Sequence, residues 1–378
     1  MSGRTVDAAG RARTLRKPRK ATIYRFLRRV HLTVALITAA PLVVTSLTGA
    51  LLVFGHELEQ LVRPLPKVTA RQAPVLSFSE LLARVRAQRP DVGVWAVVPK
   101  PEPETPWRLW LKGGKGIFEI DPWSGEILDA YRPKDTPYNI VRALHRRWMV
   151  DGKPQSDWTR TAISITALAL MVQVLFGIWM WAIPARPLQR LRPAFGRGRR
   201  FAWQSLHMAS GVATSLILLV VAFTGIAMYW TDSTRTIVDA ALPGEVERPK
   251  EPRVAGLAPV ADLDEAVATA RRLVPDARVA SVRPPGKPGA PVHVALETSG
   301  TGVNSRVWVG DAPPRVIAFY DGREASAATR FWHFKYRLHV GDFGGLPVRI
   351  LWLLVSLMPL AFVLSGLWLW RDRRRFAR

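Results

Sequence analysis

Four apolar stretches without a charged residue decide the class of this chain. They are Leu32–Gly55, Thr161–Ile183, Met208–Thr231 and Ile350–Trp370. A helix needs ~20 such residues to cross the hydrocarbon core of a bilayer, and each stretch reaches that length. The first is too long, and is followed by too much further membrane pattern, to be a cleaved signal peptide. The sequence predicts an integral membrane α-helical protein with four transmembrane helices.

The net charge of +25 would favour nucleic-acid binding if it were spread over a folded domain. Most of it lies instead in residues 1–29, in the loop around 185–200 and in the tail after Trp370. Because consecutive spans alternate in direction, these segments lie on one side, which the positive-inside rule assigns to the cytoplasm. The charge therefore predicts topology and contact with anionic membrane lipids, with no nucleic acid as partner.

The two long segments between spans then face outward and read as small α+β domains. Helical spacing of apolar residues predicts helices at 77–88 and 262–273. Short β-prone runs predict strands near 94–98, 107–111, 116–120, 278–282, 291–297, 306–309 and 315–319. The predicted order is a basic segment 1–29, a span 30–56, an outer domain 57–157, a span 158–184, a basic loop 185–202, a span 203–231, an outer domain 232–346, a span 347–370 and a basic tail 371–378.

Several chemistries are excluded by what the sequence lacks. Cysteine is absent, so the chain has no disulfide, no thiolate metal site and no iron–sulfur cluster. Neither outer segment carries a phosphate-cradling glycine motif or a Ser/His/Asp order, which argues against nucleotide binding and hydrolysis. No flavin or NAD motif occurs, so any electron donor must be a separate protein or a quinol.

The second half of the chain repeats the plan of the first. His31 is followed 18 residues later by Gly49 of a Thr-Gly pair, and His207 is followed 18 residues later by Gly225 of another. Eighteen residues make five turns at ~3.6 residues each, so each histidine shares a helix face with its glycine. In each half a further histidine, His145 or His339, precedes the second span, and these second spans close similarly at Phe176–Trp181 and Ser365–Trp370.

The direction of the spans sorts these histidines into two pairs. His31 and His207 begin parallel spans near the inner face, whereas His145 and His339 precede the returning spans at the outer face. Two such pairs can hold two b-type haems through neutral imidazole nitrogens, without covalent attachment. The alternative for each single histidine is an interfacial side chain or a helix cap. His333 is the rival of His339 for the outer pair, or else a contact for substrate.

The other histidines and the small and basic residues permit simpler readings. His56 reads as interfacial, and His293 alternates with Val292 and Val294, which predicts a place on the solvated face of a strand. The glycines near the histidines either make room for a porphyrin or let helices pack closely; they are Gly49, Gly177, Gly225 and Gly366. The basic residues near them either pair with haem propionates or serve topology and lipid contact; they are Arg28, Arg29, Arg146, Arg147, Arg199, Arg200, Lys335 and Arg337.

These motifs, in this order, resemble the PepSY-associated transmembrane family. The resemblance rests on the two Thr-Gly pairs with their histidines, on Leu338-His339-Val340-Gly341 and on the Leu-Trp-Leu-Trp end of the last span. The segment Asp121–Ile127 is similar to the end of a PepSY domain, and in the second half Phe319–Gly322 is the nearest substitute for it. The resemblance covers about residues 24–373.

The resemblance implies a bacterial inner-membrane protein with two extracytoplasmic, periplasmic PepSY-like domains. One branch, the FoxB-like di-haem reductases, reduces ferric iron in siderophores. By position, His31 and His207 would hold the inner haem b, and His145 and His339 the outer one. We expect a ferric-siderophore reductase that takes electrons from an unidentified cytoplasmic or quinol donor, with the ferric siderophore near Arg142, Trp148, Trp332, His333 and Tyr336.

Two other functions fit the same sequence. One is a haem electron carrier that serves another periplasmic reductase or a quinol. The other is a non-enzymatic PepSY-type protein that binds or restrains a periplasmic partner and uses its spans as an anchor. The second function predicts no haem and gives the four paired histidines no role, so haem content separates it from the others.

Overall fold

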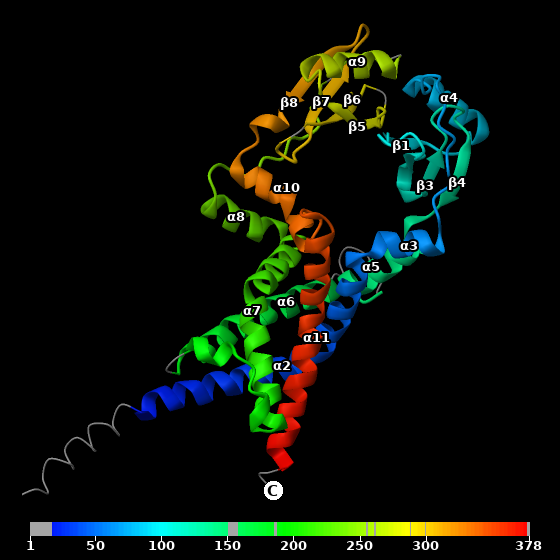
Figure 1. Ribbon diagram of the computed structural model, residues 1–378. Coiled ribbons are helices and arrows are strands. Elements are labelled where there is room, and N and C mark those ends of the chain that lie inside the picture. The colour runs from blue at the N-terminus through cyan, green and yellow to red at the C-terminus, as the bar shows by residue number, and fades with distance from the viewer. Residues whose placement is uncertain are drawn as a thin grey trace, which may run out of the picture. The chain divides into compact units, whose positions relative to one another are not determined.

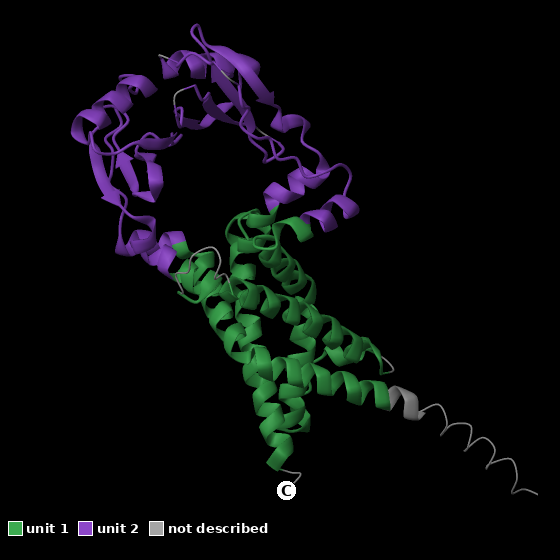
Figure 2. Cartoon of the chain, turned by 180° about the vertical axis from the view of Figure 1, so that it is seen from behind, with its two compact units in different colours: residues 1–55, 141–234, 335–378 green, residues 56–140, 235–334 purple. Residues whose placement is uncertain are grey.

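The computed structural model describes residues 17–149, 158–184, 187–254, 256–260, 262–287, 289–298 and 300–375. The chain divides into two compact units, coloured separately in Figure 2. The membrane unit comprises residues 1–55, 141–234 and 335–378, and the sheet unit comprises residues 56–140 and 235–334. Residues 1–16 of the basic N-terminal segment, and 376–378 of the tail, lie outside the described residues.

Four long helices build the membrane unit (Figure 1): α2 (Lys17–Val53), α6 (Trp158–Ala182), α7 (Arg199–Ala227) and α11 (Gly345–Arg375). Each is long and apolar enough to cross a membrane, which confirms the four predicted spans within the described chain. Helix α2 packs against α6 and α11, and α7 packs against the same two helices. Large side chains such as Ile37 and Leu216 are more than 70% exposed on these helices, as expected for side chains that face lipid. The chain is a membrane protein.

One interhelical contact replaces part of the hydrogen-bond ladder of α11. Proline 359 lies inside this helix and cannot donate a backbone hydrogen bond. Beside it, the Ser46 hydroxyl of α2 donates to the Ser356 carbonyl at 2.5 Å and accepts from Leu360 N at 3.3 Å. The α2 side chain therefore satisfies backbone groups that would be costly to leave unpaired in lipid.

Shorter helices that the sequence did not predict flank the spans. They are α3 (Gly55–Val62), α5 (Pro137–Arg147), α8 (Thr231–Ala241) and α10 (Ala327–Val340). Short 3₁₀ turns lie at Lys112–Gly114, Pro133–Asp135, Pro187–Leu191, Phe195–Arg197 and Gly322–Glu324. Helices α5 and α10 matter most for function, because they carry His145 and His339.

The sheet unit contains one eight-stranded antiparallel sheet in the order β4-β3-β2-β1-β5-β6-β7-β8. Its strands are β1 (Val94–Val98), β2 (Trp107–Leu111), β3 (Ile117–Ile120), β4 (Ile127–Tyr131), β5 (Arg278–Arg283), β6 (Val292–Glu297), β7 (Ser305–Gly310) and β8 (Arg315–Tyr320). We expected two separate outer domains, but β1 pairs with β5 through Val97 and Val282 and joins them edge to edge. Pairing removes two exposed strand edges, which is the physical reason for the join.

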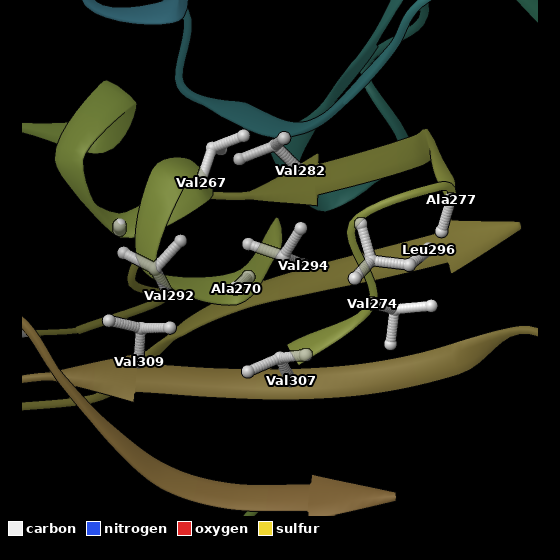
Figure 3. Packing of buried hydrophobic residues seen from close by; sticks show 11 residues of the cluster. Val267, Ala270, Val274, Ala277, Val282, Val292, Val294, Leu296, Val307 and Val309 are labelled. Atoms are coloured by element: carbon white, nitrogen blue, oxygen red, sulfur yellow. The ribbon is translucent and has the colours of Figure 1, made fainter. Parts of the chain in front are cut away.

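Each half of the sheet has its own helix and its own core. Helix α4 (Phe78–Gln88) packs Leu81 and Val85 against Leu109 and Ile120 of the first four strands. Helix α9 (Leu263–Leu273) covers β5, β6 and β7, and Figure 3 shows their valines meeting its apolar face. The other face of β5–β7 is left for polar side chains, because successive residues of a strand point to opposite faces.

The loop between β3 and β4 differs from its counterpart between β7 and β8. In the first, the Asp121 carboxylate accepts hydrogen bonds from Trp123 N and Ser124 N. The matching loop of the second half begins at Asp311, whose carboxylate binds Arg315 and Ala258 N. We expected Phe319–Gly322 to replace the first turn, which is wrong, because that segment covers the end of β8 and the residues after it and does not connect β7 to β8.

Candidate functional site

The structure brings together four histidines as two pairs within the membrane unit. The ring centres of His31 (α2) and His207 (α7) are 6.4 Å apart, and their planes are nearly perpendicular at 78°. The ring centres of His145 (α5) and His339 (α10) are 6.3 Å apart, with an angle of 62°. These are the pairs that the direction of the spans predicts.

Both separations match two imidazoles that share one metal ion. A metal lies ~2.0 Å from each coordinating nitrogen and the ring centre ~1.2 Å farther back, so two rings on opposite sides of one ion have their centres ~6.4 Å apart. Edge-to-face ring contacts without a metal reach the same separation, as Trp148 and Trp158 do at 6.3 Å, so the spacing permits a shared metal ion but does not require one. Each pair therefore has the spacing of a two-histidine metal site.

The outer pair is held by equivalent threonines of α2 and α7. Thr48 Oγ1 lies 2.9 Å from His145 Nδ1, and Thr224 Oγ1 lies 3.2 Å from His339 Nδ1. His339 Nδ1 also lies 3.0 Å from the Val221 carbonyl, to which it can donate as a neutral ring. Such partners fix the tautomer and leave Nε2 to bind a metal.

The inner pair has a less regular set of partners. His207 Nδ1 lies 2.7 Å from Ser365 Oγ of α11, and its ring centre lies 5.1 Å from that of Phe362. His31 Nδ1 is buried without a well-formed hydrogen bond among the described residues, although the Gln173 backbone of α6 lies beside it. Ser365 thus fixes one ring of this pair through its hydroxyl.

Glycines make room for the rings of the outer pair. A Cβ added to Gly49 would lie 3.3 Å from His145 Cε1, and one added to Gly225 would lie 3.1 Å from His339 Cε1. Both distances are shorter than an ordinary van der Waals contact of a Cβ atom. The sequence left open whether these glycines make room for a porphyrin or let helices pack closely; in the structure each contacts the outer histidine of its half.

The two pairs lie at opposite ends of the spans. Gly49, which contacts His145, comes 18 residues after His31 on the same helix, which is ~27 Å along its axis. Gly225, which contacts His339, has the same offset from His207 on α7. The hydrocarbon core of a bilayer is ~30 Å thick, so the two pairs are separated by nearly the whole core.

A cavity of about 260 Å³ lies at the inner pair. His31 and His207 line it together with Gly177 and Gly366, and most of its wall is apolar. A Cβ on Gly177 would meet nothing within 4 Å, so its missing side chain leaves open space. The cavity is therefore a mostly apolar space lined by both imidazoles of the inner pair.

Two arginines line this cavity among its apolar walls: Arg28 of α2 and Arg373 of α11. The Arg373 Nε is buried without a hydrogen-bond partner among the described residues, so it is available to an anion. The sequence left open whether the basic residues near the inner histidines pair with propionates or serve topology; Arg28 lines the cavity, whereas Arg199 stacks over Trp368 and Arg200 forms an ion pair with Asp372. The tertiary structure brings Arg373 from the tail to the cavity, which no local pattern predicts.

The outer pair lies beside a cluster of positive charge. Burial lowers the pKa of His145 to about 4, and the neighbouring His339 lowers it further; burial likewise lowers the pKa of His339. Burial, followed by the charges of Arg142 and Arg160, also lowers the pKa of Arg146. Both imidazoles are therefore neutral near pH 7, which is the form that binds metals.

The residues that we expected around the substrate divide between the two units. Arg142, Trp148 and Tyr336 belong to the membrane unit, and Trp332 and His333 to the sheet unit. Trp148 packs its ring against Trp158, and its Nε1 is buried without a partner in the described chain. Trp332 is only 9% exposed, with the Arg248 guanidinium 6.0 Å from its ring centre, so its ring offers little surface to a substrate.

Two histidines of the sheet unit differ in their surroundings. His56 is exposed and stacks on Tyr138, and its interfacial role stays a prediction. The solvated position predicted for His293 is wrong: its ring packs 5.2 Å from that of Trp308 and lines a pocket with His333. Side chains of the adjacent strands, Arg283 and Arg306 with Trp308, cover part of the face on which His293 lies.

Comparison with known proteins agrees with this arrangement. The model of the PepSY-associated TM region family matches residues 28–373, which is nearly the whole chain and includes all four paired histidines. The chain belongs to the PepSY-associated TM region family. A search of curated proteins finds no match to it. The family assignment thus rests on the match of the family model to residues 28–373.

Proposed function

We propose that this protein is a di-haem b-type reductase of the bacterial inner membrane, which passes electrons across the membrane to reduce a ferric siderophore in the periplasm. The observation that supports it best is the pair of two-histidine sites, with ring centres 6.4 and 6.3 Å apart, at opposite ends of the spans. Each of the two halves of the chain supplies one histidine to each site, which fits a duplicated pair of helices.

The donor set of each site suits haem better than a bare metal ion. In the described chain no group of three or more His, Asp or Glu side chains is placed to hold a metal. Two imidazoles alone would leave most coordination positions of an iron ion open, whereas the porphyrin of a haem would supply the others, so each histidine pair would be enough to hold it. The apolar cavity and the unpartnered Arg373 Nε at the inner site fit a macrocycle with anionic propionates.

The chain's own residues position the cofactor and keep water away from it. His31 and His207 would hold the inner haem, and His145 and His339 the outer one, through Nε2, with Thr48, Thr224 and Ser365 orienting three of the rings. Bound haem supplies one-electron transfer, with a potential set by its ligands and burial. Reduction of Fe(III) to Fe(II) weakens the grip of a hard oxygen chelator, which releases the iron.

The geometry favours His339 over His333 as the outer ligand. The two residues are six positions apart on α10, which is ~600° of rotation, so they lie on different faces of that helix. His339 faces His145, whereas His333 lines a pocket of the sheet unit. The arginine-rich segments lie at the same end of the spans, which supports cytoplasmic termini. The sheet unit would then lie in the periplasm.

A visible spectrum of the purified protein tests this proposal first. We expect non-covalent haem near two per chain, with b-type bands on reduction, and oxidation of the reduced protein by a ferric siderophore. A colourless preparation from haem-replete cells, with no gain on adding haem, would contradict the proposal and favour the anchor protein. Haem that is reducible but inert toward ferric chelates would favour the electron carrier for another reductase or a quinol.

A further inference from the structure

A second cavity lies on the polar face of the sheet unit, away from the α9 core. It has a volume of about 250 Å³, and three neighbouring strands form its floor. Arg283 of β5 pairs in register with His293 of β6, and Ala295 of β6 pairs with Arg306 of β7. These side chains share one face because they alternate with the valines that point into the core.

The lining of this cavity is basic. Arg283, His293, Arg306 and His333 line it together with Ser281 and Asn304, and no carboxylate is among the described residues of the lining. Arg283 Nε and His293 Nδ1 are buried there without a hydrogen-bond partner among the described residues. Leaving buried polar groups unpaired costs free energy unless a ligand supplies the partner.

The electrostatics point to the same kind of ligand. Burial, with Arg306 adding repulsion, lowers the pKa of Arg283, and burial with both arginines lowers the pKa of His293 to about 4. Glu251 offsets part of the charge on Arg283, whose guanidinium lies 4.2 Å from the ring centre of Trp95. Arg306 has a long contact of 3.5 Å to the Pro249 carbonyl. Two guanidinium groups thus face one small polar cavity.

We propose that this pocket binds a small multivalent oxyanion, with Arg283 and Arg306 as its charged contacts and His293 as a neutral donor. Arginine forks match the geometry of carboxylate and phosphate oxygens, and two of them fit a ligand with at least two negative charges. The volume is below the usual range for a drug-sized ligand, so the pocket takes a free small anion or one polyanionic group. The ligand is a polycarboxylate or a phosphate.

The test uses the purified full-length protein at pH 7 and constant ionic strength, titrated with sodium citrate or sodium phosphate against sodium chloride. A bound ligand stabilises the folded state, so the thermal midpoint of the sheet unit should rise and saturate with citrate or phosphate. The anion that binds more tightly, citrate or phosphate, shows whether the natural ligand is a polycarboxylate or a phosphate. Arg306→Gln should weaken this binding by at least about tenfold, because it removes a charge-assisted hydrogen bond.

Matched variants keep the result interpretable. Arg278 is an exposed arginine of β5, the strand that also carries Arg283, and it forms an ion pair with Glu297 away from the pocket. Arg278→Gln should therefore leave binding unchanged. Arg306→Lys keeps the positive charge at the same position. Comparing it with Arg306→Gln shows whether the glutamine variant loses binding because the charge is gone or because the protein unfolds. The inference is overturned if neither anion acts beyond sodium chloride, or if Arg278→Gln weakens binding as much as Arg306→Gln. None of these readouts depends on haem.

Discussion

At the residue scale, each outer histidine depends on two small neighbours, a threonine that orients its Nδ1 and a glycine that gives its ring room. For His339 these are Thr224 and Gly225, adjacent residues of α7. A threonine can bond back to its own helix, as Thr224 does to the Val220 carbonyl at 2.7 Å, and still contact the ring. A Thr-Gly pair therefore gives a histidine both a hydrogen-bond partner for Nδ1 and space for its ring.

Replacing Gly225 by Val should remove the outer haem that we propose, because even a Cβ there would lie 3.1 Å from His339 Cε1. The expected result is about one haem per chain in place of two, measured by the pyridine haemochrome spectrum. The control is Ala213→Val, at an exposed position of the same helix, which should keep both haems. Full haem content in Gly225→Val would show that the ring has room to shift.

The ligand assignment itself predicts independent losses. His207→Ala should remove the inner haem only, and His339→Ala the outer haem only, because the two pairs are ~27 Å apart along the helix. Haem content and the spectrum of the remaining haem measure this. If His339→Ala keeps both haems while His333→Ala loses one, the assignment of the outer ligand is wrong.

His293 predicts a pH effect in the sheet unit. Burial, then Arg283 and Arg306, lower its pKa to about 4 from the ordinary 6.5, so the unfolded chain binds more protons between these values. Its contribution therefore destabilises the fold as the pH falls from about 6.5 towards 4. Hydrogen exchange of β6 should show this loss between pH 7 and pH 5, and His293→Gln should reduce it. An identical pH dependence in both proteins would contradict the burial of this ring.

At the element scale, helices α4 and α9 begin side by side and cap each other across the two halves of the sheet. The Asp264 carboxylate of α9 accepts from Phe78 N at 2.7 Å and Ser79 N at 3.0 Å. In return, Ser79 Oγ of α4 accepts from Leu263 N at 3.1 Å and donates to Asp262. Carboxylates at helix N-termini are favourable because the exposed N–H groups carry partial positive charge.

Asp264→Ala should therefore weaken the junction of the two halves. Loss of a helix N-cap costs typically ~1 kcal/mol, and here two backbone donors of α4 lose their acceptor. Faster hydrogen exchange in the first turn of α4 would measure it. Asp276→Ala, at an exposed position after α9, is the control and should leave this exchange unchanged. Unchanged exchange in Asp264→Ala would mean that water replaces the carboxylate without cost.

At the scale of the whole molecule, orientation in the membrane follows from where the arginines lie. A reporter active only in the periplasm should be inactive when fused at Gly196, in the basic loop between α6 and α7. The same reporter should be active when fused within the sheet unit, for example at Gly286. Activity at Gly196 would reverse the topology and place the inner histidine pair outside.

The sequence alone determined the spans, the repeat of histidine and Thr-Gly along each half, and most strands of the outer segments. These features are local: span length, helical period and strand alternation each depend on residues close together in the chain. The helices α5 and α10 and strand β4 were missed, although Ile140, Val141 and Leu144 of α5 recur at helical spacing, which is a signal that could have indicated that helix.

The tertiary structure decided how the distant parts meet. It joined the two outer segments into one sheet through Val97 and Val282, and it seated His145 and His339 against Gly49 and Gly225. It also brought Arg373 to the inner cavity and placed His293 in a basic pocket. Contacts of this kind depend on the packing of elements far apart in the chain. The sequence alone does not predict them, because a local period shows that a face is buried but not which element covers it.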